Sequence, residues 1–273
     1  MEEQRKLCEN LGLKGRILLA EEGINATLEG TVKNINKYKK ELSQKKLFKN
    51  IIFKESEGTG KAFSRLEIKV RKEVVTLGAG KFDIKKETAK EITAKKLHNL
   101  YKNKKEDFVV LDLRNDFEIK AGYFENSINP NLENFRDLPN KLKDKELEEL
   151  KIKSQNGTKI IPVCTGGIRC EKATCLLKKE GFKNLYQLKD GIHTYMQKYP
   201  SAYFKGSLFV FDNRMTTPVV DAPNREIVGR CIYCNKKCEQ FYSNDTVRPS
   251  RKVICCPTCA RRHTSTLRPC LPI

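Results

Sequence analysis

A cysteine, two glycines and an arginine lie close together in the segment CTGGIRC, which runs from Cys164 to Cys170. Gly166 and Gly167 can adopt positive φ, so the chain can curl until several backbone N–H groups face inward. A free cysteine thiol has a pKa of about 8.5, and a helix N-terminus or a neighbouring cation such as Arg169 lowers it. The segment therefore predicts an anion-binding loop around a cysteine thiolate, or around a sulfur that carries an added sulfur or oxygen atom.

Two charged residues and a second cysteine are candidates for supporting this loop. Asp112 and Arg114 come at the end of a predicted strand and could reach the same sheet edge as Cys164; the alternative is an ion pair that only fixes the loop. Cys170 opens the next helix, where it could form a disulfide with an oxidised Cys164 or serve only as a small residue. Tyrosine-phosphatase-like loops place five residues between cysteine and arginine, whereas this chain has four. A single sulfur-bound group therefore fits the loop better than a phosphate.

The C-terminal part of the sequence carries two cysteine pairs with metal-ligand spacing. Cys231 and Cys234 form one C-x-x-C pair, Cys256 and Cys259 form the other, and twenty-one residues separate the pairs. Four thiolates give the tetrahedral site that Zn²⁺ prefers, and a short segment without much apolar core would take its fold from the ion. Reduced cysteines without a metal are the alternative. Other possible ligands in this part are Cys238, Cys255, Cys270 and His263.

The cysteine count and the absence of long apolar stretches indicate a compartment. Eleven cysteines, an odd number, favour thiol chemistry and metal binding over a disulfide framework. No stretch approaches the ~18 apolar residues of a membrane helix, and the start MEEQRKLCEN lacks the features of a signal peptide. We therefore expect a soluble, cytoplasmic protein with no membrane partner; the sequence does not indicate an oligomeric state.

The chain is strongly basic, with 54 Lys and Arg against 34 Asp and Glu and a formal net charge of +20. Such an excess attracts polyanions, although many solvated lysines would give the same count. Residues 202–273 carry twelve Lys and Arg against five acids, which favours RNA. In this region Phe241 and Tyr242 could stack on bases, with a solvated basic tail as the alternative. The candidate phosphate contacts are Arg248, Arg251, Arg261, Arg262 and Arg268.

The elements that must position these residues divide the 273-residue chain into three parts. Residues 1–80 predict a small α+β domain of helices, short strands and an extended piece at 51–55. Residues 88–200 alternate helices with apolar strands such as FVVLDLR and KIIPVC, which predicts an α/β domain with a parallel sheet covered on both faces. Cys164 then follows the carboxyl end of a strand, where chemistry collects in such sheets. Residues 201–273 form the basic, cysteine-rich region.

The sequence also resembles a known enzyme family along most of its length. CTGGIRCEK, DLRNDFE and GFKNLYQLKDGI look like a rhodanese domain, and LKGRILLAEEGIN, KAFSRLEIKVRKEVVTLG and FVFDNR are similar to the rhodanese-like tRNA uridine hydroxylases. The resemblance implies a ferredoxin-like, acylphosphatase-like domain ahead of the rhodanese domain, with a zinc-ribbon-like region after it. It also implies that the N-terminal sheet lacks its first strand, because the chain starts too late to contain it, which would leave an unpaired edge.

The same resemblance implies an oxidoreductase that hydroxylates the wobble uridine of tRNA at C5 with molecular oxygen. Cys164 matches the family's essential cysteine, described as a persulfide intermediate. The anticodon stem-loop would be the partner, oxygen the co-substrate and zinc a structural ion, and no organic cofactor is evident. The alternatives are a rhodanese-type sulfurtransferase or persulfide carrier, and a noncatalytic zinc-dependent RNA-binding module that would tolerate loss of Cys164. The residues that match the family's loop are Thr165, Gly166, Gly167, Ile168 and Arg169.

Overall fold

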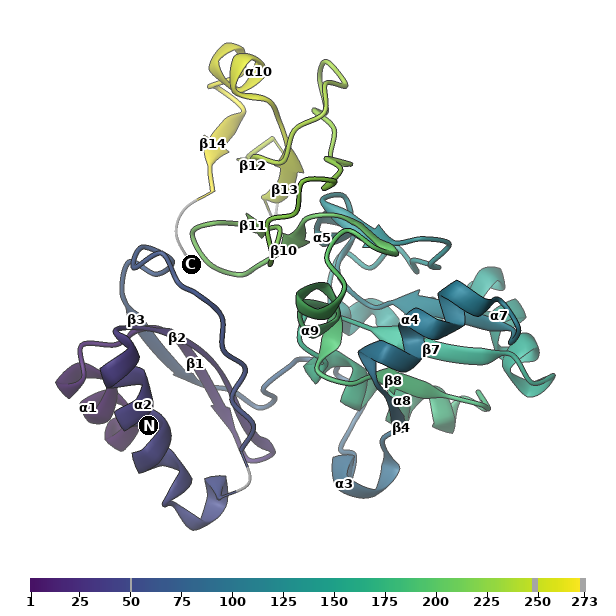
Figure 1. Ribbon diagram of the computed structural model, residues 1–273, viewed down its shortest axis with the longest axis horizontal. Helices are drawn as coiled ribbons and strands as arrows, with labels where there is room; N and C mark the ends of the chain where they lie inside the picture. Colours follow the sequence, from purple (N-terminus) through teal and green to yellow (C-terminus); the bar gives the residue numbers. More distant parts are fainter. Residues whose placement is uncertain (50, 247–249, 271–273) are drawn as a thin grey trace. The chain divides into compact units, whose positions relative to one another are not determined.

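The computed structural model describes residues 1–49, 51–246 and 250–270 (Figure 1). They form two compact units, one of residues 1–76 and 211–214 and the other of residues 77–210 and 215–270. Within the part of the chain that the structure describes, no helix is long and apolar enough to cross a membrane. We describe each unit separately.

The N-terminal unit is built on a three-stranded sheet. Strands β1 (Lys14–Ala20) and β2 (Gly23–Glu29) form an antiparallel hairpin, and β3 (Leu66–Val70) pairs in parallel with the other side of β1. The strand order is β2-β1-β3, so β2 and β3 are the edges of this sheet among the described residues. The predicted extended piece at residues 51–55 forms neither helix nor strand.

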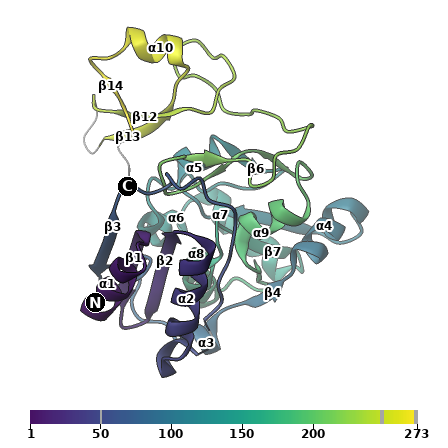
Figure 2. The ribbon, with the colours of Figure 1, turned by 60° about the vertical axis from the view of Figure 1, so that its left-hand side comes forward.

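Two helices cover this sheet. They are α1 (Glu2–Asn10) and α2 (Val32–Ser43), and Figures 1 and 2 show both on one face of the strands; a short 3₁₀ turn, η1 (Lys46–Phe48), follows α2. Thr31 caps α2 by accepting the N–H of Asn34 at 3.3 Å. Both helices are amphipathic, and each buries one apolar stripe against the sheet. The core consists of Cys8, Leu11, Leu13, Ile17, Tyr38, Leu42 and Ile68.

The DNR part of FVFDNR also belongs to the N-terminal unit. The backbone N–H of Asn213 donates to the carbonyl of Ala62 at 2.9 Å, and its side-chain amide donates to the carbonyl of Lys61 at 3.0 Å. Glu29 in turn accepts the N–H of Ala62 at 2.9 Å. This family-like segment is thus fixed by backbone contacts with residues distant in sequence.

The larger unit contains the predicted parallel sheet. Strand β5 (Phe108–Asp112) pairs in parallel with β7 (Lys159–Val163), and β4 (Lys90–Ile92) pairs in parallel with β8 (Tyr186–Leu188). An isolated parallel bridge between Ile160 and Leu185 joins the two pairs. The prediction of a parallel sheet is therefore confirmed.

Helices lie along this sheet and bury its apolar side chains. Ile161 and Val163 of β7 share a core with residues of α4 and α9, whereas the alternate residue Ile160 is also buried and points to the other face, where α8 contacts β7 and β8. Both faces are thus covered, as the sequence predicts. The helical segments of this part are α3 (Ile84–Glu87), α4 (Ala94–Asn103), α5 (Asp116–Ile119), η2 (Phe135–Asp137), α6 (Leu138–Lys141), α7 (Lys145–Gln155), α8 (Ile168–Lys179) and α9 (Gly191–Lys198).

The C-terminal region is attached to this unit by strand pairing. Strand β6 (Gly122–Phe124) pairs antiparallel with β9 (Phe204–Gly206), and β10 (Leu208–Phe209) pairs with β11 (Thr216–Thr217). A further antiparallel sheet has the order β13-β12-β14, and Figure 2 shows helix α10 beside it. The bounds of these last elements are β12 (Phe241–Asn244), β13 (Arg251–Ile254), α10 (Pro257–Arg262) and β14 (Leu267–Pro269).

Candidate active site and metal site

The loop that carries Cys164 connects the end of β7 to the start of α8. Gly167 caps the helix with φ +92°, in the left-handed region that glycine adopts without strain. The first residues of α9 hold the other side of the loop, because the N–H groups of Ile192 and His193 donate to the carbonyls of Cys164 and Thr165 at 3.0 and 3.1 Å. The loop is therefore fixed between two helix N-termini.

Gly191 allows this close approach of α9 to the loop. Its φ is +73°, and a Cβ at this position would lie 2.6 Å from the carbonyl oxygen of Thr165 and 2.7 Å from Gly166. A side chain here would displace the loop backbone that surrounds the sulfur. The glycine of the KDGI segment is consequently part of the site, although sequence reasoning did not single it out.

The sulfur of Cys164 is fully buried and surrounded by donors. Gly167 donates its backbone N–H to Sγ at 3.1 Å. Burial alone would raise the pKa of Cys164, but a hydrogen bond from the Cys170 thiol, the charge of Arg169 and further backbone N–H groups outweigh burial and lower the pKa to about 5. The predicted thiolate is therefore the form that this geometry favours at neutral pH.

Cys170 is the thiol partner of this thiolate. It occupies the first turn of α8 and is fully buried. Burial raises the pKa of Cys170 well above its usual value, and its hydrogen bond to Cys164 raises it further. One sulfur of the pair is thus ionised while the other keeps its proton and donates it.

Arg169 is held by a residue that sequence reasoning missed. Its guanidinium makes two hydrogen bonds to Glu118, at 2.6 and 2.8 Å, and a third to the hydroxyl of Thr165 at 3.2 Å. Glu118 is completely buried; burial would raise its pKa, but the charge and hydrogen bonds of Arg169 outweigh burial and lower it. The arginine therefore closes the loop as half of a buried ion pair and still contributes positive charge at Cys164.

Asp112 and Arg114 form a second buried ion pair, with 2.6 Å between Nη2 of the arginine and the carboxylate. Arg114 also donates to the carbonyl of Gly122 at 2.7 Å, and its guanidinium lies over the ring of Phe204 at 5.4 Å. These contacts tie β5 to the β6–β9 strand pair. The structure thus contains the ion pair that the sequence offered as one alternative, and a chemical role for either residue stays a prediction.

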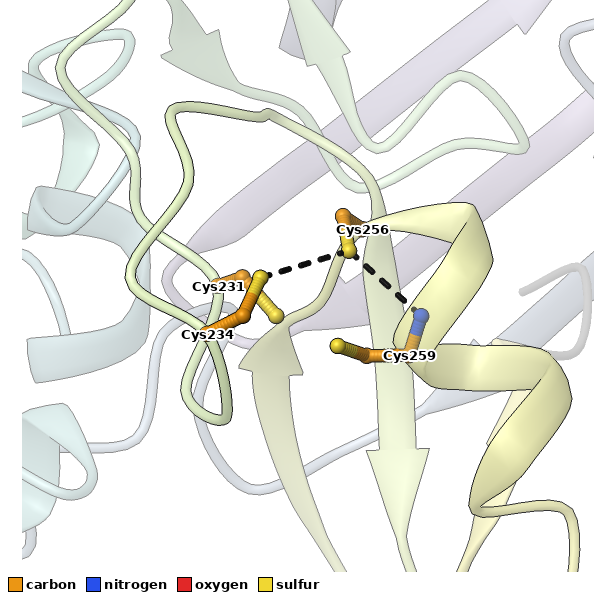
Figure 3. Close-up of side chains that lie close together, drawn as sticks. All are labelled: Cys231, Cys234, Cys256 and Cys259. Atoms are coloured by element: carbon orange, nitrogen blue, oxygen red, sulfur yellow. Dashed lines mark hydrogen bonds between the residues drawn. The ribbon is translucent and has the colours of Figure 1, made fainter.

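The two C-x-x-C pairs of the tail meet in space (Figure 3). The sulfur atoms of Cys231, Cys234, Cys256 and Cys259 all lie within 4.8 Å of one another. Sulfurs that surround Zn²⁺ tetrahedrally at about 2.3 Å are about 3.8 Å apart, and Cys234 and Cys256 lie 3.7 Å apart. The donor set and its spacing fit a tetrahedral metal ion. Within the described ranges, no group that could hold a metal includes the other possible ligands, Cys238, Cys255, Cys270 and His263.

The arginines predicted to contact RNA differ in whether their side chains already pair with a carboxylate. Arg251 pairs with Glu133, and Arg268 pairs with Asp245 at 2.7 Å. Arg261 and Arg262 are exposed on α10, and Arg248 lies outside the described residues.

The expected stacking of Phe241 on bases is wrong, because only 6 % of its surface is exposed and it packs in the core of the cysteine-rich part. A phenylalanine whose ring is needed for the core cannot present a face to RNA. Tyr242 beside it is half-buried.

Comparison with known proteins agrees with this architecture. Family models match in succession: a UPF0176 acylphosphatase like domain over residues 1–74, a rhodanese-like domain over 93–198 and a rhodanese C-terminal domain over 205–271. They confirm the predicted order of an acylphosphatase-like and a rhodanese domain followed by a separate C-terminal region.

Curated relatives extend the match to nearly the whole chain. A protein of Onion yellows phytoplasma is 39 % identical over 254 residues, which cover 92 % of this chain and 79 % of that protein. Relatives from Bacillus licheniformis and Bacillus mycoides are 37 % and 36 % identical, covering 93 % and 98 % of this chain and 77 % and 82 % of those proteins. All three are named tRNA uridine(34) hydroxylase. This chain therefore belongs to the tRNA uridine(34) hydroxylase family.

Proposed function

We propose that this protein hydroxylates the wobble uridine of tRNA at C5 in an oxygen-dependent reaction centred on Cys164. Family membership supports the reaction and the substrate. The single structural observation that carries the proposal is the buried Cys164 sulfur, which accepts a backbone N–H at 3.1 Å and whose pKa is lowered to about 5. A reactive thiolate at neutral pH is what the proposed chemistry needs from the protein.

The residues around Cys164 prepare the sulfur and hold it in place. Backbone N–H groups and the charge of Arg169 stabilise the thiolate in a buried site, where such interactions are stronger than in solution. The sulfur could act in either of two ways: by addition to the pyrimidine ring, which makes C5 electron-rich, or by delivery of an oxygen atom that it carries. Both require Cys164, and both require the loop to hold a negative charge.

We further propose that the four clustered cysteines hold a structural Zn²⁺ ion. When bound, the ion would crosslink the knuckle of Cys231 and Cys234 to the start of α10, which carries Cys256 and Cys259. The short strands β12, β13 and β14 bury few apolar side chains of their own, so such a crosslink would supply much of their stability.

The partner that we propose is the anticodon stem-loop of tRNA, with molecular oxygen as co-substrate. The net charge of +20 supports an RNA partner. Because tRNA is the substrate, we expect the protein to act in the cytoplasm. We retain the division into residues 1–80, 88–200 and 201–273 as the proposed functional division, in which the middle part carries the reactive sulfur and the last part contacts RNA.

A rhodanese-type sulfurtransferase is the second candidate. The same buried thiolate could carry a transferable sulfur atom, and a rhodanese-like family model matches residues 93–198. Loss of thiosulfate-to-cyanide sulfur transfer in a Cys164 variant, without any change in tRNA nucleosides, would favour this alternative.

The decisive experiment is nucleoside mass spectrometry of tRNA from a bacterial strain that lacks its own hydroxylase of this family. Complementation with the wild-type gene should restore 5-hydroxyuridine derivatives, and Cys164→Ser should not. Cys175→Ser is the matched control, because this buried cysteine of α8 hydrogen-bonds to the carbonyl of Glu171 instead of entering the loop. Restoration by the Cys164→Ser gene, or failure of the wild-type gene when expressed, would contradict the proposal.

A further inference from the structure

Two aromatic rings stack on each other at the surface of the cysteine cluster. The rings of Tyr233 and His263 have centroids 3.7 Å apart and planes only 2° from parallel. Tyr233 lies in the knuckle between Cys231 and Cys234, and His263 follows α10 directly. The stack therefore joins the same two segments that the clustered thiols join.

Tyr233 is exposed although most large aromatic side chains near the cluster are not. It keeps 40 % of its surface exposed, whereas Phe209 and Phe241 are 0 % and 6 % exposed in the core beneath. His263 covers one face of the ring, and the exposed part of the Tyr233 side chain leaves surface on which a flat ligand can stack.

The stacked pair is held rigidly. The hydroxyl of Tyr233 lies 3.4 Å from that of Thr266, and the N–H of His263 donates to the carbonyl of Cys259 at 3.0 Å. The carbonyl of His263 accepts the N–H of Leu267 at 2.9 Å. Rings fixed in this way lose little conformational freedom when a flat ligand stacks on them.

Positive charge surrounds the pair. Arg261 and Arg262 immediately precede His263, and Arg230 immediately precedes Cys231; all three are exposed. Within the described ranges, neither Arg261 nor Arg262 forms an ion pair with a carboxylate, in contrast to Arg251 and Arg268. Exposed aromatic faces next to guanidinium groups are the combination that binds unpaired nucleotides, since bases stack and phosphates pair with arginine.

We propose that Tyr233 and His263 form a stacking platform for an unpaired base of the tRNA substrate, with Arg261 and Arg262 contacting the adjacent phosphates. This proposal rests on the proposed function for the identity of the RNA, and it adds the residues that recognise it. A double-stranded RNA would not suit the platform, because its bases are stacked on one another and offer no free face. The single-stranded part of an anticodon stem-loop suits the platform, because its bases can offer a free face.

The test is the affinity of the metal-loaded, full-length protein for an anticodon stem-loop RNA, measured by fluorescence anisotropy. Tyr233→Ala and His263→Ala should each weaken binding by about five- to one-hundred-fold, the usual effect of removing one aromatic stacking partner. Tyr233→Phe should bind like the wild type because it keeps the ring. The slope of affinity against salt concentration should stay unchanged in both Tyr233 variants, since neither removes a cationic side chain.

Matched controls separate the platform from general damage. Tyr123→Ala removes a tyrosine of similar exposure, 41 %, from strand β6 and should leave RNA affinity unchanged. Metal content per chain checks that the variants keep the cysteine cluster. If Tyr233→Ala loses its metal, Tyr233→Leu retains an apolar side chain at that position but cannot stack, and the same weakening is expected.

Several results would overturn the platform. One is that metal-loaded Tyr233→Ala and His263→Ala bind the stem-loop with wild-type affinity, and another is that Tyr123→Ala loses as much RNA affinity as they do. The proposal would also fail if an acidic peptide displaced the bound stem-loop as well as unlabelled stem-loop does, or if the wild-type protein did not bind the stem-loop. Failure of the proposed function is distinguishable, because it would appear as unchanged tRNA nucleosides.

Discussion

The pKa of Cys164 is set by two opposing effects. Burial disfavours the thiolate, whereas the Cys170 thiol, the charge of Arg169 and the loop amides favour it, and the second set prevails. Because the pKa is lowered to about 5 in the folded protein, well below the value of a free cysteine, ionisation of Cys164 stabilises the fold. This contribution is complete above the unfolded value and is lost as the pH falls through about 5.

The lowered pKa can be measured directly. We expect the ultraviolet thiolate absorbance of the wild type, minus that of Cys164→Ser, to rise with a midpoint near pH 5. The subtraction removes the signals of the other cysteines. A midpoint of about 8.5, the value of a free cysteine, would show that the loop does not stabilise the thiolate.

Substitutions of Cys170 test the thiol-to-thiolate hydrogen bond. Its thiol is the first of the contacts that lower the pKa of Cys164. Cys170→Ala removes this donor and should therefore raise the pKa of Cys164, whereas Cys170→Ser keeps a donor and should raise it less. The same difference absorbance measures both variants, each against its own Cys164→Ser double variant. Equal midpoints in the wild type and Cys170→Ala would contradict this role.

Glu118 should contribute strongly to stability because it neutralises a buried guanidinium. Glu118→Gln leaves Arg169, which is 7 % exposed, without its carboxylate. Loss of one partner of a buried ion pair costs about 3 to 5 kcal/mol, so the free energy of unfolding in urea should fall by about that amount. Glu133→Gln is the control, since its pair with Arg251 is exposed on both sides and should matter far less. Similar losses for both variants would argue against the buried pair.

The reactive loop could be predicted from sequence because its residues are adjacent, and a glycine turn before a helix has one local geometry. Glu118 could not be found in this way, since it lies 51 residues before Arg169 and meets it only after β5 and β7 have paired. The only sequence signal for Glu118 was that an acidic residue follows the end of the predicted strand FVVLDLR by one helical turn. Gly191 was missed for the same reason, because the need for glycine arises from the packing of α9 on the loop.

At the scale of elements, the parallel strands of the larger unit were predictable, whereas the antiparallel pairing of β6 with β9 was not. β5 and β7 are runs of buried apolar residues, which is typical of strands covered on both faces. The three-residue strands β6 and β9 are too short to show any alternation, and their pairing depends on residues about eighty positions apart. Yet this pairing attaches the segment after residue 200 to the sheet that carries the active loop.

Helix α5 connects the two candidate sites within the larger unit. Phe117 packs edge-to-face on Phe209, with ring centroids 5.0 Å apart, and Phe209 packs in the same way on Phe241 in the core of the cysteine cluster. The next residue of the helix, Glu118, holds Arg169. One four-residue helix therefore faces the metal site with one side chain and the reactive loop with the next.

The cysteine cluster should determine whether the elements around it fold. Cys231→Ala removes one of four clustered thiols, so we expect the loss of one metal ion per chain and a lower thermal transition for the C-terminal sheet. Elemental analysis and thermal unfolding measure the two effects. Cys270→Ser is the control: this cysteine directly follows β14 and lies near Ser243, outside the cluster, so the variant should keep the metal. Full metal content in Cys231→Ala would show that a different set of ligands binds the ion.

For the whole molecule, the composition predicted a polyanion partner but did not indicate which lysine and arginine side chains contact it. The excess of positive charge is spread over the entire chain, and only the structure distinguishes arginines that pair with carboxylates, such as Arg251 and Arg268, from those that do not. The order of domains followed from the family resemblance, because its motifs are distributed from the first strands to the cysteine-rich end.

The dependence of tRNA affinity on salt should identify the arginines that contact phosphate. Each phosphate contact adds about 0.7 to 0.9 to the slope of log affinity against log salt concentration, because bound cations are released from the RNA. Arg261→Gln combined with Arg262→Gln should therefore lower the slope by about 1.4 to 1.8. Arg251→Gln should lower it less, since Arg251 already pairs with Glu133. An unchanged slope in the double variant, or an equal change in Arg251→Gln, would place the phosphate contacts elsewhere on this basic molecule.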